Sequence, residues 1–111
     1  MIDVSITKDQ SGQLVEFKVK NHGNSNVCAA VSMLTLNTVN SIESFTEDNF
    51  FCEYDESGGY LLFRIDSPDV SEGTKTLLKS LELGLVSTLE EYPDEINVKI
   101  AQSGLIGGNY D

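Results

Sequence analysis

The chain has 111 residues, the size of one domain, and 40% of them are hydrophobic, so we expect a single core without an internal boundary. Its 18 acidic and 7 basic residues give a net charge of −11, which repels nucleic-acid phosphates and anionic lipid headgroups and argues against direct nucleic-acid or membrane binding. The same charge would attract a basic protein partner. The alternative explanation is that the acidic surface only increases solubility.

The sequence also indicates a compartment. No apolar run approaches the roughly 20 residues that span a bilayer. The N-terminus has neither the basic segment nor the apolar segment of a signal peptide. We therefore expect a cytoplasmic protein in which the two cysteines, Cys28 and Cys52, are reduced thiols.

The first twenty residues predict a β-hairpin. Hydrophobic and polar residues alternate over residues 2–7 and again over residues 15–20, which is the period of half-buried strands. Residues 9–12 between them read Asp-Gln-Ser-Gly, a composition typical of a turn.

A polar loop and a helix follow the hairpin. Residues 21–26 read Asn-His-Gly-Asn-Ser-Asn, a run of helix breakers and helix-capping residues. Hydrophobic residues then recur at spacings of three and four, which predicts a helix from about Asn26 to about Ser44 and places Cys28 in its first turn. The residues that we expect on its core-facing side are Val27, Val31, Leu34, Thr38, Ile42 and Phe45.

The second half of the chain repeats this order. Residues 50–54 and 60–65 are β-prone and flank a glycine-containing turn, which predicts a second hairpin. Ser67 as the cap and Pro68 as the first helical residue predict the start of a second helix, which ends before Pro93. Its apolar face comprises Val70, Thr74, Leu77, Leu78, Leu81, Leu85 and Leu89.

A last strand at residues 96–100 completes the order ββαββαβ, and residues 102–111 are expected to form a flexible tail. Two amphipathic helices can bury their apolar faces together on one face of a sheet. We therefore predict an α/β (α+β) fold, a two-layer sandwich with a five-stranded mixed sheet and two helices on one face, forming a single domain over residues 1–111.

The single histidine and Cys28 are the candidate catalytic residues. A helix N-terminus favours negative charge, so a thiol in the first turn gains thiolate character. His22, six residues earlier, can accept the thiol proton, and the first-turn amides can bind an oxyanion. These are the parts of a thiol acyl-transfer site.

Other interpretations of the same residues stay open. Cys28 can be a small buried hydrophobic residue and His22 a solvated loop side chain. We expect Cys52 in the core, because unpaired cysteine is usually buried. Two cysteines and one histidine cannot form a tetrahedral zinc site without carboxylate ligands, so we expect no metal and no cofactor.

The sequence around Cys28 resembles that of a family of ribosomal-processing cysteine proteases called Prp. The likeness begins with residues 27–32, Val-Cys-Ala-Ala-Val-Ser, of which Cys28 to Ser32 is the specific part, and it extends to Gly58-Gly59-Tyr60 and to Leu83-Gly84. By position, Cys28 matches the family's nucleophile, His22 its general base, and Ser32 a supporting serine one helical turn after the nucleophile.

The resemblance implies an endopeptidase that removes a short N-terminal extension from a protein of the large ribosomal subunit, and it implies a homodimer. The leading alternative is a catalytically silent, ribosome-associated binding module of the same fold. A thiol redox sensor is a weaker alternative, because no resolving cysteine lies nearby in the sequence.

This sequence departs from the family pattern before Cys28. Asn21 replaces the glycine that precedes the histidine, Ser25 replaces an aspartate, and Asn26 replaces an aliphatic residue. The connection from His22 to Cys28 is also shorter than in the family, so this chain has either a trimmed loop or a segment missing from the sequence as printed.

Overall fold

The computed structural model describes residues 1–21, 26–55, 59–66 and 69–102. Their order is ββαββαβ, as predicted. The elements are β1 (Ile2–Lys8), β2 (Leu14–Lys20), α1 (Asn26–Phe45), β3 (Phe50–Tyr54), β4 (Tyr60–Ile65), α2 (Glu72–Glu91) and β5 (Ile96–Gln102).

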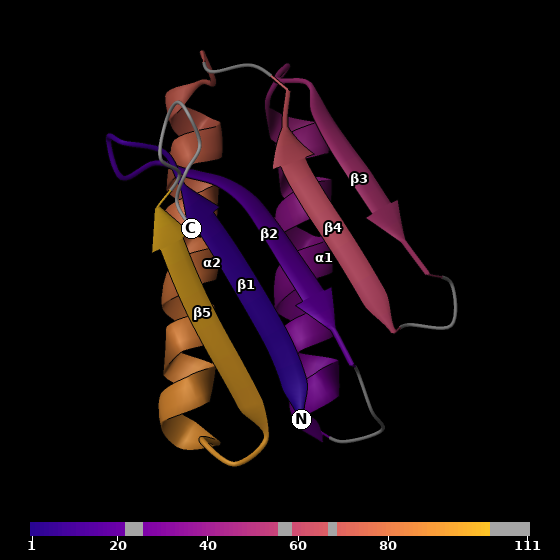
Figure 1. The fold of residues 1–111 in the computed structure, drawn as a ribbon. Helices are drawn as coiled ribbons and strands as arrows, with labels where there is room; N and C mark the ends of the chain where they lie inside the picture. Colours follow the sequence, from indigo (N-terminus) through magenta and orange to yellow (C-terminus); the bar gives the residue numbers. More distant parts are fainter. Residues whose placement is uncertain (22–25, 56–58, 67–68, 103–111) are drawn as a thin grey trace.

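The five strands form one mixed sheet with the order β3-β4-β2-β1-β5. Neighbouring strands are antiparallel except β1 and β5, which run parallel with Val4 opposite Val98. Both helices lie on the same face of the sheet, with α1 behind β2 and β4 and α2 behind β1 and β5 (Figure 1). The predicted two-layer α+β fold is therefore confirmed.

The core lies between the sheet and the helices. The rings of Phe17 on β2 and Phe63 on β4 are stacked with their centroids 5.0 Å apart. A Cβ atom on Gly84 of α2 would lie 3.0 Å from Cδ2 of Leu34, so the glycine lets α1 approach α2 closely. The buried residues of the two helices are Val27, Cys28, Val31, Thr35, Thr38, Val39, Ile42, Thr74, Leu78, Leu81 and Leu85.

Two details of the helix predictions are wrong. Phe45 was expected in the core but is 78% exposed. A 20-residue helix is about 30 Å long whereas a seven-residue strand spans about 23 Å, so the last residue of α1 extends past the sheet. The second helix begins at Glu72 with Ser71 as its N-cap, and Asp69 and Val70 precede it. The proposed Ser67 cap and Pro68 lie outside the described residues.

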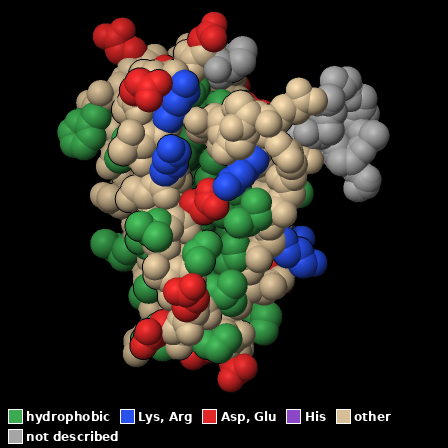
Figure 2. Space-filling view, turned by 90° about the vertical axis from the view of Figure 1, so that its left-hand side faces the viewer, with side chains coloured by type: hydrophobic (Ala, Val, Ile, Leu, Met, Phe, Trp, Pro, Cys, Tyr) green, Lys and Arg blue, Asp and Glu red, His purple; other side chains and the backbone are tan. Residues whose placement is uncertain are grey.

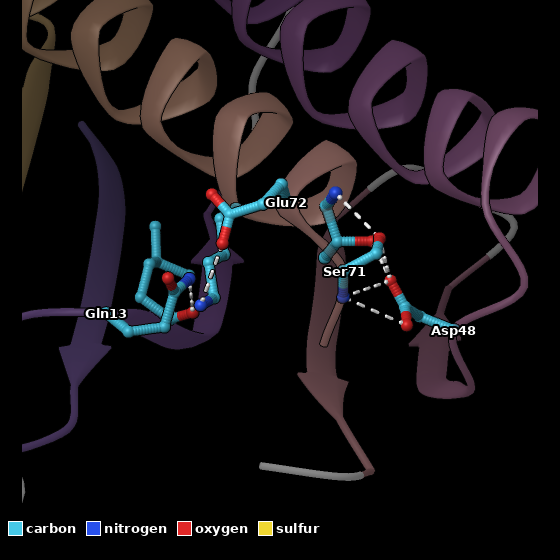
Figure 3. A network of polar contacts seen from close by, with 7 residues as sticks. Gln13, Asp48, Ser71 and Glu72 are labelled. Carbon is cyan, nitrogen blue, oxygen red and sulfur yellow. Dashed lines mark hydrogen bonds and ion pairs between the residues drawn. The ribbon is translucent and has the colours of Figure 1, made fainter. Parts of the chain in front are cut away.

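A polar network around Asp48 joins the end of α1 to the start of α2. The carboxylate of Asp48 accepts hydrogen bonds from the backbone N–H of Ser71 (3.0 Å to Oδ2) and from the Ser71 hydroxyl (2.6 Å), as Figure 3 shows. The hydroxyl of the buried Thr74 also donates to Asp48. These bonds hold the pKa of Asp48 below its ordinary value of 3.8, and the bond from the Ser71 hydroxyl makes the largest contribution.

This network predicts a pH-dependent contribution to stability. Because the folded-state pKa is lowered, the carboxylate stabilises the fold fully above pH 3.8, and the effect is lost as pH falls through the folded pKa. Asp48→Asn should lower the thermal unfolding midpoint at pH 7, and its difference from the unmodified chain should shrink in acid. The control is Glu47→Gln, at the exposed neighbouring position. An equal loss of stability at every pH would contradict the role of the charge.

Candidate active site

Cys28 is the third residue of α1 and lies in its first turn, as predicted. Its side chain is 6% exposed and belongs to the hydrophobic core cluster. The first turn of α1 contains no acidic residue, so nothing within the turn offsets the positive end of the helix dipole. This end of α1 is therefore suited to a negative charge.

Asn21 fixes the chain at the end of β2, directly before His22. Its φ of +66° lies in the left-handed region. Glycine enters this region most readily, and asparagine enters it more readily than most other residues. Its backbone N–H donates to the Gly59 carbonyl (3.2 Å), and its Nδ2 donates to Oδ2 of Asp3 (2.7 Å). The bond from Asn21 is the largest cause of a lowered pKa at Asp3.

This conformation gives a physical reason for the first departure from the family pattern. Glycine adopts a positive φ without steric cost, and asparagine is among the few other residues that enter this region routinely. Asn21 therefore adopts a backbone conformation that glycine, the residue of the family pattern, would also allow.

His22 and Ser25 lie outside the described residues, so the relation of His22 to Cys28 stays a prediction. The described ends of this connection are Asn21 and Asn26, five residue steps apart. Such a segment spans at most about 18 Å, which is the upper limit for the separation of its two ends. The length of the His22–Cys28 loop also stays a prediction.

A groove of about 410 Å³ lies between α1 and the β3–β4 hairpin. It includes Ser32, one helical turn after Cys28, which confirms the predicted placement of the serine on α1 but does not test its role. We call it the α1–hairpin groove. Its principal lining residues are Ser32, Leu36 and Val39 from α1, and Cys52, Tyr54 and Tyr60 from the hairpin.

Cys52 is half-buried rather than fully buried. It packs against the core cluster, as expected, but it also lines the groove. Burial raises the pKa of the Cys52 thiol, because a thiolate is less well solvated there than in water. The raised pKa lowers the thiolate fraction of Cys52 at neutral pH, which makes it a weaker nucleophile than a solvent-exposed cysteine.

Three of the groove residues, Leu36, Tyr54 and Tyr60, were not predicted from the sequence as part of a site. Leu36 falls outside the predicted core-facing stripe of α1, and it is 44% exposed. Tyr54 was assigned only to a strand, and Tyr60 to a strand and to the Gly58-Gly59-Tyr60 likeness, although a pair of tyrosines flanking one turn was an available signal. Their meeting with Leu36 depends on how α1 crosses the sheet.

Comparison with known proteins agrees with the geometry. The model of the family described as cysteine protease Prp matches residues 1–97. No significant match was found among curated proteins.

In the part of the chain that the structure describes, no helix is long and apolar enough to cross a membrane.

Two solved structures are similar over most of the chain. The essential ribosomal processing protease Prp from Staphylococcus aureus, in complex with a covalently linked product peptide, is 27% identical with a TM-score of 0.81, covering 90% of this chain and 99% of that chain. The protein SMU.848 from Streptococcus mutans is 27% identical with a TM-score of 0.83, covering 93% of this chain and 96% of that chain.

The backbone at Asn21 generates a prediction. Asn21→Gly keeps access to positive φ and loses only the side-chain bond to Asp3, so it should change stability and activity little. Asn21→Val puts a β-branched residue in the left-handed region at a cost of about 1–2 kcal/mol. Valine should therefore lower the unfolding midpoint and displace the start of the His22 connection, which reduces peptide cleavage. Equal behaviour of the two variants would show that this turn does not position the site.

Proposed function

This chain belongs to the family of Prp cysteine proteases, and we propose that it is a cytoplasmic endopeptidase that removes a short N-terminal extension from a protein of the large ribosomal subunit. Cys28 is the proposed nucleophile and His22 the proposed base. The observation that carries the assignment is the position of Cys28 in the first turn of α1. This turn follows β2, at whose end Asn21 is hydrogen-bonded to Asp3, and both lie within the residues that match the family.

The proposed reaction follows from these positions. His22 takes the proton from the Cys28 thiol, and the thiolate sulfur attacks the scissile carbonyl carbon. The first-turn amides of α1 stabilise the negative oxygen of the tetrahedral intermediate. The intermediate collapses to a thioester as the peptide amine leaves with the proton from His22, and water then releases the acid and restores the thiol.

The relatives support a covalent step and a peptide substrate. The Staphylococcus aureus structure contains a product peptide that is covalently linked. The net charge of −11 on this chain suits a substrate from a basic ribosomal protein. Ser32, one turn beyond Cys28, is the proposed supporting residue, because residues four apart share one face of a helix.

One observation favours a second candidate function. Cys28 is 6% exposed and belongs to the hydrophobic cluster, which is the environment of a structural cysteine. A silent module of the same fold would keep this packing and bind a ribosomal partner without cutting it. Measured cleavage distinguishes the two functions.

We also propose a homodimer. An excess of leucines on α2 would support a dimer only if they were exposed. Of the six leucines of α2, only Leu83 is largely exposed, at 69%, whereas Leu77 and Leu89 pack against the core. Ile100 on the edge strand β5 is 48% exposed, and Figure 2 shows hydrophobic side chains gathered on the face of α2 and β5. Sedimentation that yields only a 12.2 kDa species at micromolar concentration would contradict a dimer.

Replacement of the nucleophile tests the proposed reaction. Cys28→Ala should reduce cleavage of a peptide copied from the ribosomal protein's N-terminal extension by at least about 10³-fold, the scale typical of a lost covalent nucleophile. The measurement is product formation followed by mass spectrometry. The matched control is Cys52→Ala, which should retain most of the activity at a modest cost in stability. Cleavage by Cys28→Ala at the unmodified rate would exclude the mechanism.

A further inference from the structure

A second depression, which we call the α2 cleft, lies between the first β-hairpin and α2. Its volume is about 360 Å³. The lining residues that matter below are Lys8, Gln13 and Leu14 from the hairpin and Glu82, Leu83 and Val86 from α2. The α2 cleft shares no lining residue with the α1–hairpin groove and does not include Cys28, so the proposed reaction gives it no role.

Both walls of the α2 cleft are held in place by polar contacts. In the hairpin turn, the carboxylate of Asp9 accepts hydrogen bonds from the backbone N–H groups of Ser11 (2.9 Å) and Gln13 (3.0 Å). Across the cleft, Nζ of Lys8 on β1 lies 2.9 Å from Oε2 of Glu82 on α2. The cleft is therefore formed by the described residues before anything occupies it.

The α2 wall leaves apolar surface in water. Leu83 is 69% exposed, and Val86, one turn later on the helix, is partly exposed. Figure 2 shows hydrophobic side chains gathered on this face of the molecule. Covering such side chains releases ordered water and lowers the free energy. The cleft is therefore suited to an occupant with aliphatic side chains.

The described chain ends at the rim of the α2 cleft. Gln102, the last residue of β5, lies opposite Lys8 of β1 in the parallel register, and neighbouring strands are about 4.8 Å apart. Its Nε2 donates to the carbonyl oxygens of Asp9 (3.0 Å) and Gln10 (3.1 Å) in the hairpin turn. These bonds join the end of β5 to the wall of the cleft. Residues 103–111 follow directly, and they lie beyond the residues 1–97 that match the family.

The sequence of residues 103–111 suits the α2 cleft. It reads Ser-Gly-Leu-Ile-Gly-Gly-Asn-Tyr-Asp and places two aliphatic residues, Leu105 and Ile106, three and four steps after Gln102. Three to four steps reach at most about 11 to 14 Å, which is enough to cross the cleft from its rim. Gly104 allows the chain to turn away from the strand direction.

The charges of the two parts are also compatible. Lys8 and Lys79 outnumber Glu82 among the residues that line the cleft, in a chain whose net charge is −11. Residues 103–111 contain one acidic residue, Asp111, and no basic residue. The locally positive cleft therefore attracts this segment, whereas the rest of the acidic surface repels it.

We propose that residues 103–111 fold back onto the α2 cleft of the same chain, and that Leu105 and Ile106 cover Leu83 and Val86. This contact is independent of the proposed peptide cleavage. The rival occupant is a second copy of the chain, which would cover Leu83 from outside.

Methyl NMR spectroscopy of the full chain tests the contact. Nuclear Overhauser effects should connect the methyl groups of Leu105 or Ile106 with those of Leu83 or Val86. Leu83→Asp should weaken these effects at least about tenfold, because an unpaired carboxylate beneath two aliphatic side chains loses its hydration. The matched control is Ser80→Asp, which adds the same charge at an exposed position of α2 outside the cleft and should leave them unchanged.

A variant of the segment itself keeps the test independent of the folding of α2. Leu105→Ser combined with Ile106→Ser should shift the backbone amide resonances of Gln13, Leu83 and Val86. The control, Ser103→Ala combined with Asn109→Ala, should leave these three resonances in place.

A mixture of isotope-labelled and unlabelled chains distinguishes the two occupants. The effects should arise within one chain. The inference is overturned if they arise only between chains, if they are absent from the full chain, or if Leu83→Asp and Ser80→Asp behave alike.

Discussion

The packing of α1 on the sheet is the constraint on which the rest of the site depends. Seven of its twenty residues are buried, including Val31 and Ile42, which are fully enclosed. This packing fixes α1 against the sheet, behind β2 and β4 (Figure 1). The single histidine of the sequence, His22, precedes Cys28 by six residues, and their approach in space stays a prediction. The same crossing leaves Leu36 opposite the β3–β4 hairpin, where the groove opens.

Much of the fold could be predicted because hydrophobic periodicity records which face of each element is buried. The strands at residues 50–54 and 60–65 agree with the prediction to the residue, since turn-forming residues bound them on the inner side. The start of α2 was mispredicted because Ser67-Pro68 and Ser71 are both good local helix starts. A tertiary contact decides between them, since Asp48 binds the backbone N–H and the hydroxyl of Ser71.

The candidate site was only partly predictable for the same kind of reason. The position of Cys28 is a local property of the helix start and could be predicted from spacing. Asn21 appeared to be a departure from the family, because the positive φ that explains it is a property of the backbone. The groove could not be predicted, because its two walls are separated by more than ten residues and meet only through the angle at which α1 crosses the sheet.

The central claim is that Cys28 is an activated nucleophile served by His22, and competition between the two thiols tests it most directly. The folded protein is treated briefly with iodoacetamide at neutral pH, and the modified peptides are quantified by mass spectrometry. Cys28 lies in the first turn of α1, where the helix dipole favours a thiolate, whereas burial raises the pKa of Cys52. The account therefore predicts that Cys28 reacts first, although its side chain is only 6% exposed, and that His22→Ala slows its reaction selectively. Equal labelling of the two cysteines, or labelling of Cys28 that is unchanged by His22→Ala, would contradict the account.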